Sequence, residues 1–396
     1  MDRKRFRLLL LTLTLVVLAL ICLLISNCSW MWRLQEEVEP EPMGVEEEYA
    51  NLLRMISDLY IGDYDESEIH AEALRALVGS LDEWSFYMTA EEYEAFLYRA
   101  NNRYVGIGVE VLADETNDGM GIVNVFSGSP ADLGGILPGD IITFIDGNSV
   151  AGFTIEEMRA VLSRPIGDYA TITLIRDGVN TIQLEIMYGE VFVDPIKFSM
   201  IEDDIGYIAI SNFDAQSAEP FISAIETLLD SGASCFIFDV RDNSGGRVSE
   251  MTMMLDYLLP EGEIFIQIDR NGEEQITLSD EDWLDVPAVV LVNRYSYSAA
   301  EYFAAILNEY GYAETVGEQT TGKSRSQTTH RLPDGGALHL STGQYLTKNR
   351  VRLHDVGGLT PDYIIEFSDE EMALLLSGKL DQADDTQLQK AISLLS

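Results

Sequence analysis

Ala288-Val-Val-Leu-Val-Asn-Arg-Tyr-Ser-Tyr-Ser-Ala-Ala-Glu301 combines an apolar run, a polar turn and the start of a helix that extends to about Tyr310. The apolar run is typical of a buried strand, and Ser298 falls at the N-terminus of the helix. The same alternation occurs upstream, in two apolar runs and the helix between them: 206–211, 235–240 and 215–229. Buried strands that alternate with helices predict an α/β core with parallel strands.

The charge of the chain excludes one class of function. The 396 residues include 67 acidic and 25 basic ones, for a formal net charge of −42. Such a surface repels phosphate backbones, so we expect no nucleic-acid partner. The three cysteines (Cys22, Cys28 and Cys235) give neither a disulfide framework nor the spacing of a zinc site. We therefore expect no metal and no cofactor.

The N-terminus predicts a membrane anchor. Leu8–Ile25 is a run of 18 residues without charge, preceded by basic residues and followed by acidic ones. A run of this length just suffices to span a bilayer as one transmembrane helix, and its basic flank stays in the cytoplasm. We expect a single-pass protein of the cell membrane, with its N-terminus cytoplasmic and its body extracytoplasmic. The alternative is a cleaved signal peptide, but Ser26-Asn27-Cys28 makes a poor cleavage site.

Changes of pattern along the rest of the chain predict further modules. Apolar residues at helical spacing give a helical module, and short strands between turn signals give a β-rich domain. The predicted order is a cytoplasmic stub with the anchor, an acidic linker, the helical module, the β-rich domain, the α/β core and a C-terminal helical segment: 1–33, 34–44, 45–98, 99–190, 191–368 and 369–396. The apolar stripes of the helices exceed what so small a module needs internally, which makes a homodimer possible.

Two segments of the β-rich domain carry a recognisable pattern. Ser129–Gly147 closely resembles the centre of a PDZ domain, and Tyr104-Val-Gly-Ile-Gly-Val109 resembles the carboxylate-binding loop of that family. A glycine-rich loop frees backbone N–H groups for an anion, and the strand after it offers an edge to a peptide C-terminus. The predicted peptide contacts are Tyr104, Gly106, Ile107, Gly108 and Val109. The simpler alternative is that the two glycines only bend a strand.

Three segments of the α/β core resemble one family: Val292–Glu301, Gly317-Glu-Gln-Thr-Thr-Gly-Lys-Ser-Arg-Ser-Gln327 and Phe238-Asp-Val-Arg-Asp-Asn-Ser-Gly-Gly246. They resemble the nucleophile, lysine and oxyanion-loop segments of the C-terminal processing peptidases, also called tail-specific proteases. In that family the serine precedes the lysine by 25 residues, and a glutamine follows the lysine by four. Ser298, Lys323 and Gln327 have these spacings. The resemblance implies a ClpP/crotonase-like peptidase core with an inserted PDZ domain and a Ser–Lys dyad.

These residue types suit acyl transfer. Ser298 would be the nucleophile, and the N–H groups of Ala299 and of Gly245 or Gly246 would stabilise an oxyanion. Lys323 must be neutral to accept the serine proton, which costs roughly 4–5 kcal/mol at pH 7 for an ordinary lysine. Burial lowers that cost, and Gln327 can hydrogen-bond the amine without adding charge.

Each residue also has a simpler reading. Ser298 alone is a helix N-cap, Lys323 alone is a solvated loop lysine, and Glu301 either supports the site or closes a capping box with Ser298. Asp242-Asn-Ser-Gly-Gly246 mimics another serine-peptidase motif, but the chain lacks a suitably placed histidine, so Ser244 is taken as a loop residue.

The resulting prediction is a serine endopeptidase whose PDZ domain recognises the C-terminal tails of protein substrates. The alternative is a membrane-anchored PDZ scaffold on an inactive peptidase body. If the chain is an enzyme, the PDZ domain either gates access to Ser298 or only tethers the substrate.

Overall fold

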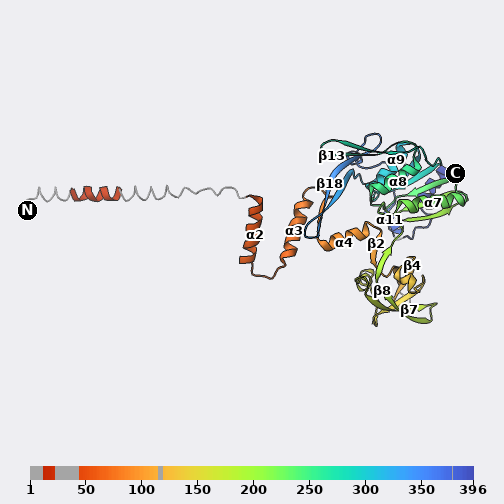
Figure 1. The fold of residues 1–396 in the computed structure, drawn as a ribbon, viewed down its shortest axis with the longest axis horizontal. Helices are drawn as coiled ribbons and strands as arrows, with labels where there is room; N and C mark the ends of the chain where they lie inside the picture. The colour runs from red at the N-terminus through yellow and green to blue at the C-terminus, as the bar shows by residue number, and fades with distance from the viewer. Residues whose placement is uncertain (1–11, 23–43, 115–118, 377) are drawn as a thin grey trace, which may run out of the picture. The chain divides into compact units, whose positions relative to one another are not determined.

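The computed structural model describes residues 12–22, 44–114, 119–376 and 378–396 (Figure 1). The chain divides into two units, Met1–Glu66 and Ser67–Ser396. In the first unit a helix covers residues 12–22, and α2 (Val45–Leu59) begins with acidic residues, which suit a helix N-terminus. No residue of α2 is buried. The predicted homodimer, which relies on such exposed apolar stripes, stays a prediction.

The prediction of a transmembrane helix near the N-terminus is wrong. Across the described ranges, no helix is both long enough and apolar enough to cross a membrane. The part of the apolar run that the structure describes, residues 12–22, is helical and rises about 17 Å at 1.5 Å per residue, against about 30 Å of hydrocarbon. This finding corrects both the predicted membrane anchor and the predicted single-pass location. Residues 8–11 and 23–25 of the apolar run, the cytoplasmic stub and most of the acidic linker lie outside the described residues.

Two helices and a short strand open the second unit: α3 (Glu66–Gly79), β1 (Phe86–Met88) and α4 (Ala90–Arg99). α4 begins at Thr89, whose hydroxyl accepts from the Glu92 N–H while the Glu92 carboxylate accepts from the Thr89 N–H. The two bonds form a capping box, which explains why the helix starts at this point. β1 pairs with β18 (Ala337–Leu346), so this early segment lies against a late part of the chain.

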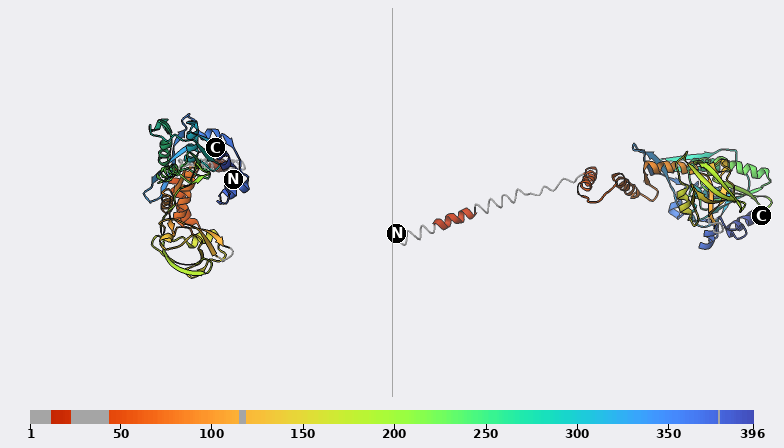
Figure 2. Two further views of the ribbon diagram at one scale, coloured as in Figure 1. Left: turned by 90° about the vertical axis from the view of Figure 1, so that its right-hand side faces the viewer. Right: turned by 90° about the horizontal axis from the view of Figure 1, so that it is seen from below.

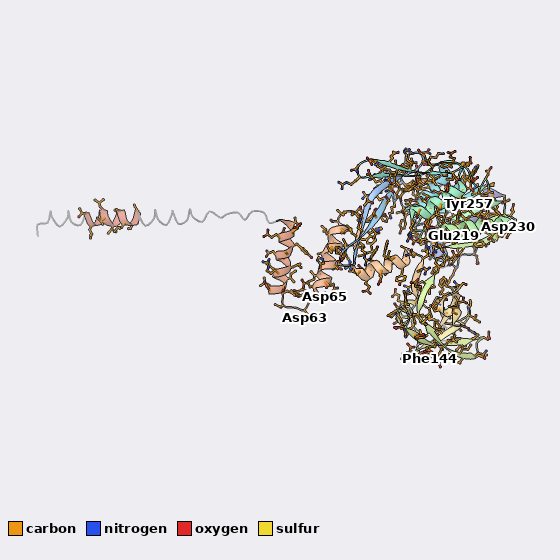
Figure 3. The ribbon with its side chains drawn as sticks, in the orientation of Figure 1. Asp63, Asp65, Phe144, Glu219, Asp230 and Tyr257 are labelled. Atoms are coloured by element: carbon orange, nitrogen blue, oxygen red, sulfur yellow. The ribbon has the colours of Figure 1, made fainter. Side chains whose placement is uncertain are left out.

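The β-rich domain forms next. Its elements are β2 (Arg103–Gly106), β3 (Val109–Asp114), β4 (Gly119–Val125), α5 (Pro130–Leu133), β5 (Ile141–Ile145), β6 (Asn148–Ser149), α6 (Ile155–Val161), β7 (Tyr169–Arg176), β8 (Asn180–Met187) and β9 (Gly189–Phe192). The main sheet has the order β3-β4-β5-β7-β8, which puts β3 at an edge. Figure 2 shows these strands gathered into one compact body, and Figure 3 labels Phe144, a partly exposed side chain of β5.

The α/β core has a six-stranded sheet. Its strands are β10 (Ile196–Ile201), β11 (Ile205–Ile210), β12 (Cys235–Asp239), β15 (Ala288–Val292), β16 (Ala313–Gly317) and β19 (Tyr363–Ile364). Their order is β10-β11-β12-β15-β16-β19, and every pair except β10–β11 is parallel. The predicted parallel α/β core is therefore confirmed.

Helices cover both faces of this sheet, since alternate strand residues point to opposite sides. One face packs on α7 (Ala218–Asp230), α8 (Val248–Leu258) and α9 (Ala299–Glu309), and Tyr257, which Figure 3 labels on α8, is among its contacts. The other face packs on the last helix, α12 (Thr386–Leu395). Two short helices, α10 (Leu353–Val356) and α11 (Asp369–Leu376), complete the C-terminal part.

A second sheet has no counterpart in the sequence analysis. It follows the order β1-β18-β13-β14, with β17 also paired to β18, and adds β13 (Gly262–Asp269), β14 (Glu274–Ser279) and β17 (Arg325–Arg331). β17 carries only polar side chains, so it lacks the apolar alternation that marks a strand. β17 begins shortly after Lys323 in the sequence, and its residues line the cavity of the candidate site.

Candidate active site

The candidate nucleophile lies in a strained turn. Ser298 ends the loop after β15 and begins α9, with φ 59° and ψ −124°. Positive φ is uncommon outside glycine, and such strain tends to persist where surrounding contacts enforce it. Here the loop is fixed by the Ser296 hydroxyl, which accepts from the Asn293 N–H and donates to the Val240 carbonyl. The serine is therefore held at the carboxyl end of the sheet by contacts that reach the neighbouring strand.

Glu301 links the nucleophile turn to the lysine loop. This buried carboxylate accepts from the N–H groups of Ser298 at 3.3 Å, Gly322 at 2.8 Å and Lys323 at 2.5 Å. It also accepts from the Thr320 hydroxyl at 2.7 Å. Burial raises the pKa of Glu301, while these donors act in the opposite sense. The bond to Ser298 is one half of the predicted capping box, but most of the bonds go to the lysine loop, which the sequence did not predict.

Lys323 lies in the same cavity as Ser298, half-buried between aromatic rings. Its Nζ is 4.5 Å from the Trp84 ring centroid and 5.9 Å from that of Tyr297. Its backbone is fixed on both sides, since its N–H meets Glu301 and its carbonyl accepts from the Tyr345 hydroxyl at 2.5 Å. Burial lowers the pKa of Lys323 to about 8, against the opposing influence of nearby carboxylates. Within the described ranges, none of these carboxylates lies within 4.0 Å of the amine.

Gln327 also lines the cavity, but its amide has other partners. It donates to the Arg325 carbonyl and to the Ser341 hydroxyl, each at 3.1 Å. The Ser341 hydroxyl in turn donates to Asp82 at 3.4 Å. These hydrogen bonds lead from Gln327 toward the N-terminal segment that carries Trp84.

The glycine loop after β12 meets the nucleophile turn because β12 and β15 are adjacent parallel strands. A Cβ on Gly245 would lie 2.8 Å from the Ser298 Cβ and 3.0 Å from the Ala299 nitrogen. The Gly245 N–H donates to the Asn243 side chain at 2.8 Å. Gly246 has φ 146°, and its neighbours bond to Phe213 as a bridge: the Gly245 carbonyl accepts from Phe213, and the Arg247 N–H donates to Phe213. Among the described residues, the N–H groups of Gly246 and Ala299 have no hydrogen-bond acceptor.

These groups share one cavity of about 870 Å³. It brings together Ser298, Lys323, Gln327, Gly245 and Gly246, together with the loop residue Ser244. Residues of α4 and β17 form further parts of its wall. In the described part of the chain, no cluster of His, Cys, Asp or Glu side chains is arranged to hold a metal ion.

The predicted peptide contacts of the β-rich domain lie around the start of β3. Gly106 ends β2, Gly108 has φ 87°, and Val109 begins the edge strand. Ile107 is only 3% exposed and packs in the domain core, so its side chain helps to fix the loop. Burial raises the pKa of the Tyr104 phenol to about 12. The peptide contacts predicted at this loop stay a prediction.

Sequence reasoning missed Trp84, Tyr297 and Asn243 as parts of the site. Trp84 stands far upstream of Lys323, and only the pairing of β1 with β18 brings it near. Tyr297 directly precedes Ser298 in the sequence, but this adjacency does not show which way the tyrosine ring points. Asn243 lies in the segment 238–246 that the sequence analysis quoted, but its buried amide joins the Ile210 carbonyl of β11 to the Gly245 N–H, and the sequence does not show this contact.

The comparisons with known proteins agree with this geometry. Residues 204–365 match the model of peptidase family S41, and residues 104–186 match that of the PDZ domain. The carboxy-terminal processing protease CtpA of Bacillus subtilis is 31% identical over 301 residues, which are 75% of this chain and 64% of that protein. Residues 204–365 thus carry the sequence pattern of peptidase family S41. The predicted PDZ domain and the resemblance to the C-terminal processing peptidases are both confirmed.

Other S41 relatives extend the match. A carboxy-terminal-processing protease of Bartonella bacilliformis is 28% identical over 330 residues, covering 80% of this chain and 74% of that one. A solved S41 protease of Bacteroides fragilis, 19% identical, shares the fold with a TM-score of 0.51 over 74% of this chain and 82% of its own. The chain spans less than two thirds of the length of the Bacillus subtilis relative.

Proposed function

We propose that this protein is a serine endopeptidase in which Ser298 is the nucleophile and Lys323 is the general base. The observation that carries the proposal is Glu301, whose single carboxylate accepts from the backbones of both residues. This bridge sets a strained serine and a half-buried lysine in one cavity. A helix N-cap and a solvated loop lysine would not require a buried carboxylate between them.

The burial of Lys323 supports its role as a base. With a pKa of about 8, roughly a tenth of the amine is neutral at pH 7, far more than for an ordinary lysine. The neutral amine takes the Ser298 proton while the serine oxygen attacks the peptide carbonyl. The resulting ammonium then gives that proton to the leaving amine as the C–N bond breaks. In the second half of the reaction Lys323 takes a proton from water, which attacks the ester, and returns it to Ser298.

The oxyanion formed in each half-reaction needs donors that are already in place. Gly246 and Ala299 are proposed for this role, since their N–H groups lie on the two loops that flank Ser298. Gly245 would shape the loop, because its own N–H is engaged by Asn243. Gln327 would act at one remove, through Ser341 and Asp82, and not by a direct bond to the amine.

The PDZ domain suggests peptide or protein substrates with accessible C-termini. A tail would add to the open edge of β3, with its carboxylate at the N–H groups of residues 106–109. α6, whose residues pack beside β3, would form the opposite wall of that groove.

Hydrolysis of an unfolded protein tests the proposal. Ser298→Ala and Lys323→Ala should each reduce turnover to background while the circular dichroism spectrum stays unchanged. Ser244→Ala is the matched control, since Ser244 is a serine of the same cavity, and it should retain most of the activity. Loss of activity in Ser244→Ala with retention of activity in Ser298→Ala would show that Ser298 is not the nucleophile. An inactive wild type that still binds tail peptides would favour the scaffold alternative.

A further inference from the structure

The amine of Lys323 is flanked by two aromatic rings that come from distant parts of the chain. The rings of Trp84 and Tyr297 lie 5.8 Å apart at an angle of 35°, and Nζ lies 4.5 Å from the first and 5.9 Å from the second. Tyr297 belongs to the nucleophile turn itself. Trp84 belongs to the segment before β1, which otherwise enters the proposed chemistry only through Asp82.

Asp82 fixes the place of Trp84. Its carboxylate accepts from the Trp84 N–H at 2.9 Å, from the Ser341 hydroxyl at 3.4 Å and from the Arg325 guanidinium at 2.8 Å. Arg325 follows the lysine loop at the start of β17, and Ser341 lies on β18 and accepts from Gln327. Burial opposes these donors, and the pKa of Asp82 is nevertheless held below its usual value. The backbone of Trp84 is therefore tied, through Asp82, to the same two strands that follow and support Lys323.

We propose that Trp84 is a positioning residue of the Ser–Lys site, whose indole closes the cavity wall over the Lys323 amine and keeps water from it. The inference rests on the proposed function, because the exclusion of water matters only if Lys323 must lose its proton. It gives the N-terminal segment a part in the chemistry and explains why Asp82, Ser341 and Gln327 form one hydrogen-bonded line.

Two opposing effects of Trp84 on the amine must be weighed. The face of an indole attracts an ammonium and so favours the charged lysine, whereas burial favours the neutral one. Burial is the largest influence on the pKa of Lys323 and lowers it. The charged groups that face the amine are Glu301 from α9 with Asp82 and Glu83 from the segment before β1, which raise that pKa. Arg325 of β17, which is paired with Asp82, and the phenols of Tyr297 and Tyr345 also line this cavity. His339 of β18 lines it too and stays neutral at pH 7, because burial lowers its pKa to about 4.

Because burial dominates, removal of the indole should make the amine harder to deprotonate. The chain has only six lysines, so protein labelled with ¹³C at the lysine Cε gives few signals, and Lys323→Arg identifies the relevant one. The titration is done in full-length Ser298→Ala protein and needs no turnover. Lys323 should titrate near 8 there, and Trp84→Ala should raise its pKa by about one unit.

Trp84→Phe keeps a smaller ring at the same place and guards against a simple folding failure, and its shift should be in the same direction but smaller. Trp283→Ala is the matched control, because Trp283 packs against Tyr312 elsewhere, and it should leave the titration unchanged. An unchanged or lowered pKa in Trp84→Ala would overturn the role of Trp84 and leave the proposed function intact. A Lys323 that titrates near 10.5 before any change at Trp84 would instead overturn the proposed function.

Discussion

Two glycine-rich loops of this molecule are proposed to bind negative charge through backbone N–H groups, and they are held in different ways. The oxyanion loop, residues 242–246, is braced by buried side-chain amides. Asn243 donates to the Ile210 carbonyl at 2.7 Å and accepts from Gly245, while Asn293 exchanges two hydrogen bonds with Asp242. The loop is thus fastened to two neighbouring strands through polar side chains that are fully buried.

The carboxylate loop of the PDZ domain, residues 104–109, relies instead on backbone bonds and one apolar side chain. The Ile107 carbonyl accepts from Ala131 at 2.7 Å, the Gly108 carbonyl accepts from Phe126 at 3.0 Å, and Ile107 itself fills the core. The proposed oxyanion exists only briefly, so its donors must be in place beforehand, whereas a tail carboxylate is a stable ligand that a looser loop can accept. The loop that is braced by buried side-chain amides is thus the one assigned to chemistry.

The largest expected effect is on the oxyanion loop. In Gly246→Ala the new Cβ would lie 2.3 Å from the Phe213 carbonyl carbon, at a backbone φ of 146° that disfavours alanine. The shift of the loop should lower kcat by about 10²–10³-fold, the usual cost of one lost donor. Gly272→Ala introduces a similar backbone strain in an open turn and should leave kcat unchanged. Near-normal kcat in Gly246→Ala would remove Gly246 from the oxyanion site.

The matching change in the PDZ loop should separate binding from chemistry. In Gly108→Ala the Cβ would lie 2.2 Å from the Ser129 Cβ, with φ at 87°. Binding of a tail peptide, measured by fluorescence polarisation, should weaken by about tenfold or more, the size of effect expected from roughly 1.4 kcal/mol. Gly128→Ala, whose added methyl meets nothing, is the control in the same domain. Tail binding that survives Gly108→Ala unchanged would place the ligand elsewhere.

Loss of the amide brace should have an intermediate effect. Asn243→Ala leaves the buried Ile210 carbonyl and the Gly245 N–H without their partner, which should cost about 1–3 kcal/mol of unfolding free energy. Denaturant unfolding measures that loss, and kcat should fall while KM changes little, because the loop contributes mainly to the transition state. An unchanged kcat at full stability would show that the brace is not needed for chemistry.

The smallest effect is expected at Ser129. Its hydroxyl donates to the Gly108 carbonyl and accepts from the Asp132 N–H, both at a long 3.3 Å. Ser129→Ala should weaken tail binding by no more than a few fold, in keeping with a loss of about 0.5–1 kcal/mol. Calorimetry resolves such a change. A loss as large as that of Gly108→Ala would mean that the carboxylate loop depends on side-chain bonds as the oxyanion loop does.

The sequence predicted those parts of the molecule whose signal is local. Residues 288–292 were predicted as a buried strand because five apolar residues adjoin a polar turn. The loops of the PDZ domain were predicted from their turn residues. β17 was not predicted, because Arg325–Arg331 is polar throughout and becomes a strand only by pairing with β18. The prediction of a transmembrane helix was wrong: it rested on hydropathy alone, and no helix among the described residues is long and apolar enough to cross a membrane.

Within the site, spacing pointed to the reactive groups but not to their supports. Ser298 and Lys323 were predicted from a motif, and the structure brings both into one cavity. Trp84 depends on the pairing of β1 with β18, which no local pattern shows. Glu301 was predicted as a support or a cap, but its bonds to Gly322 and Lys323 depend on a loop that folds back from beyond β16.

The pH dependence of kcat/KM for a short unstructured peptide tests the central claim most directly, that neutral Lys323 is the base. Because the protonated amine cannot accept the serine proton, the rate should rise with pH and level off above a single ionisation near 8. Below that point it should fall about tenfold per pH unit. A flat profile, or one that levels off near pH 6.5 as for a histidine base, would contradict the account.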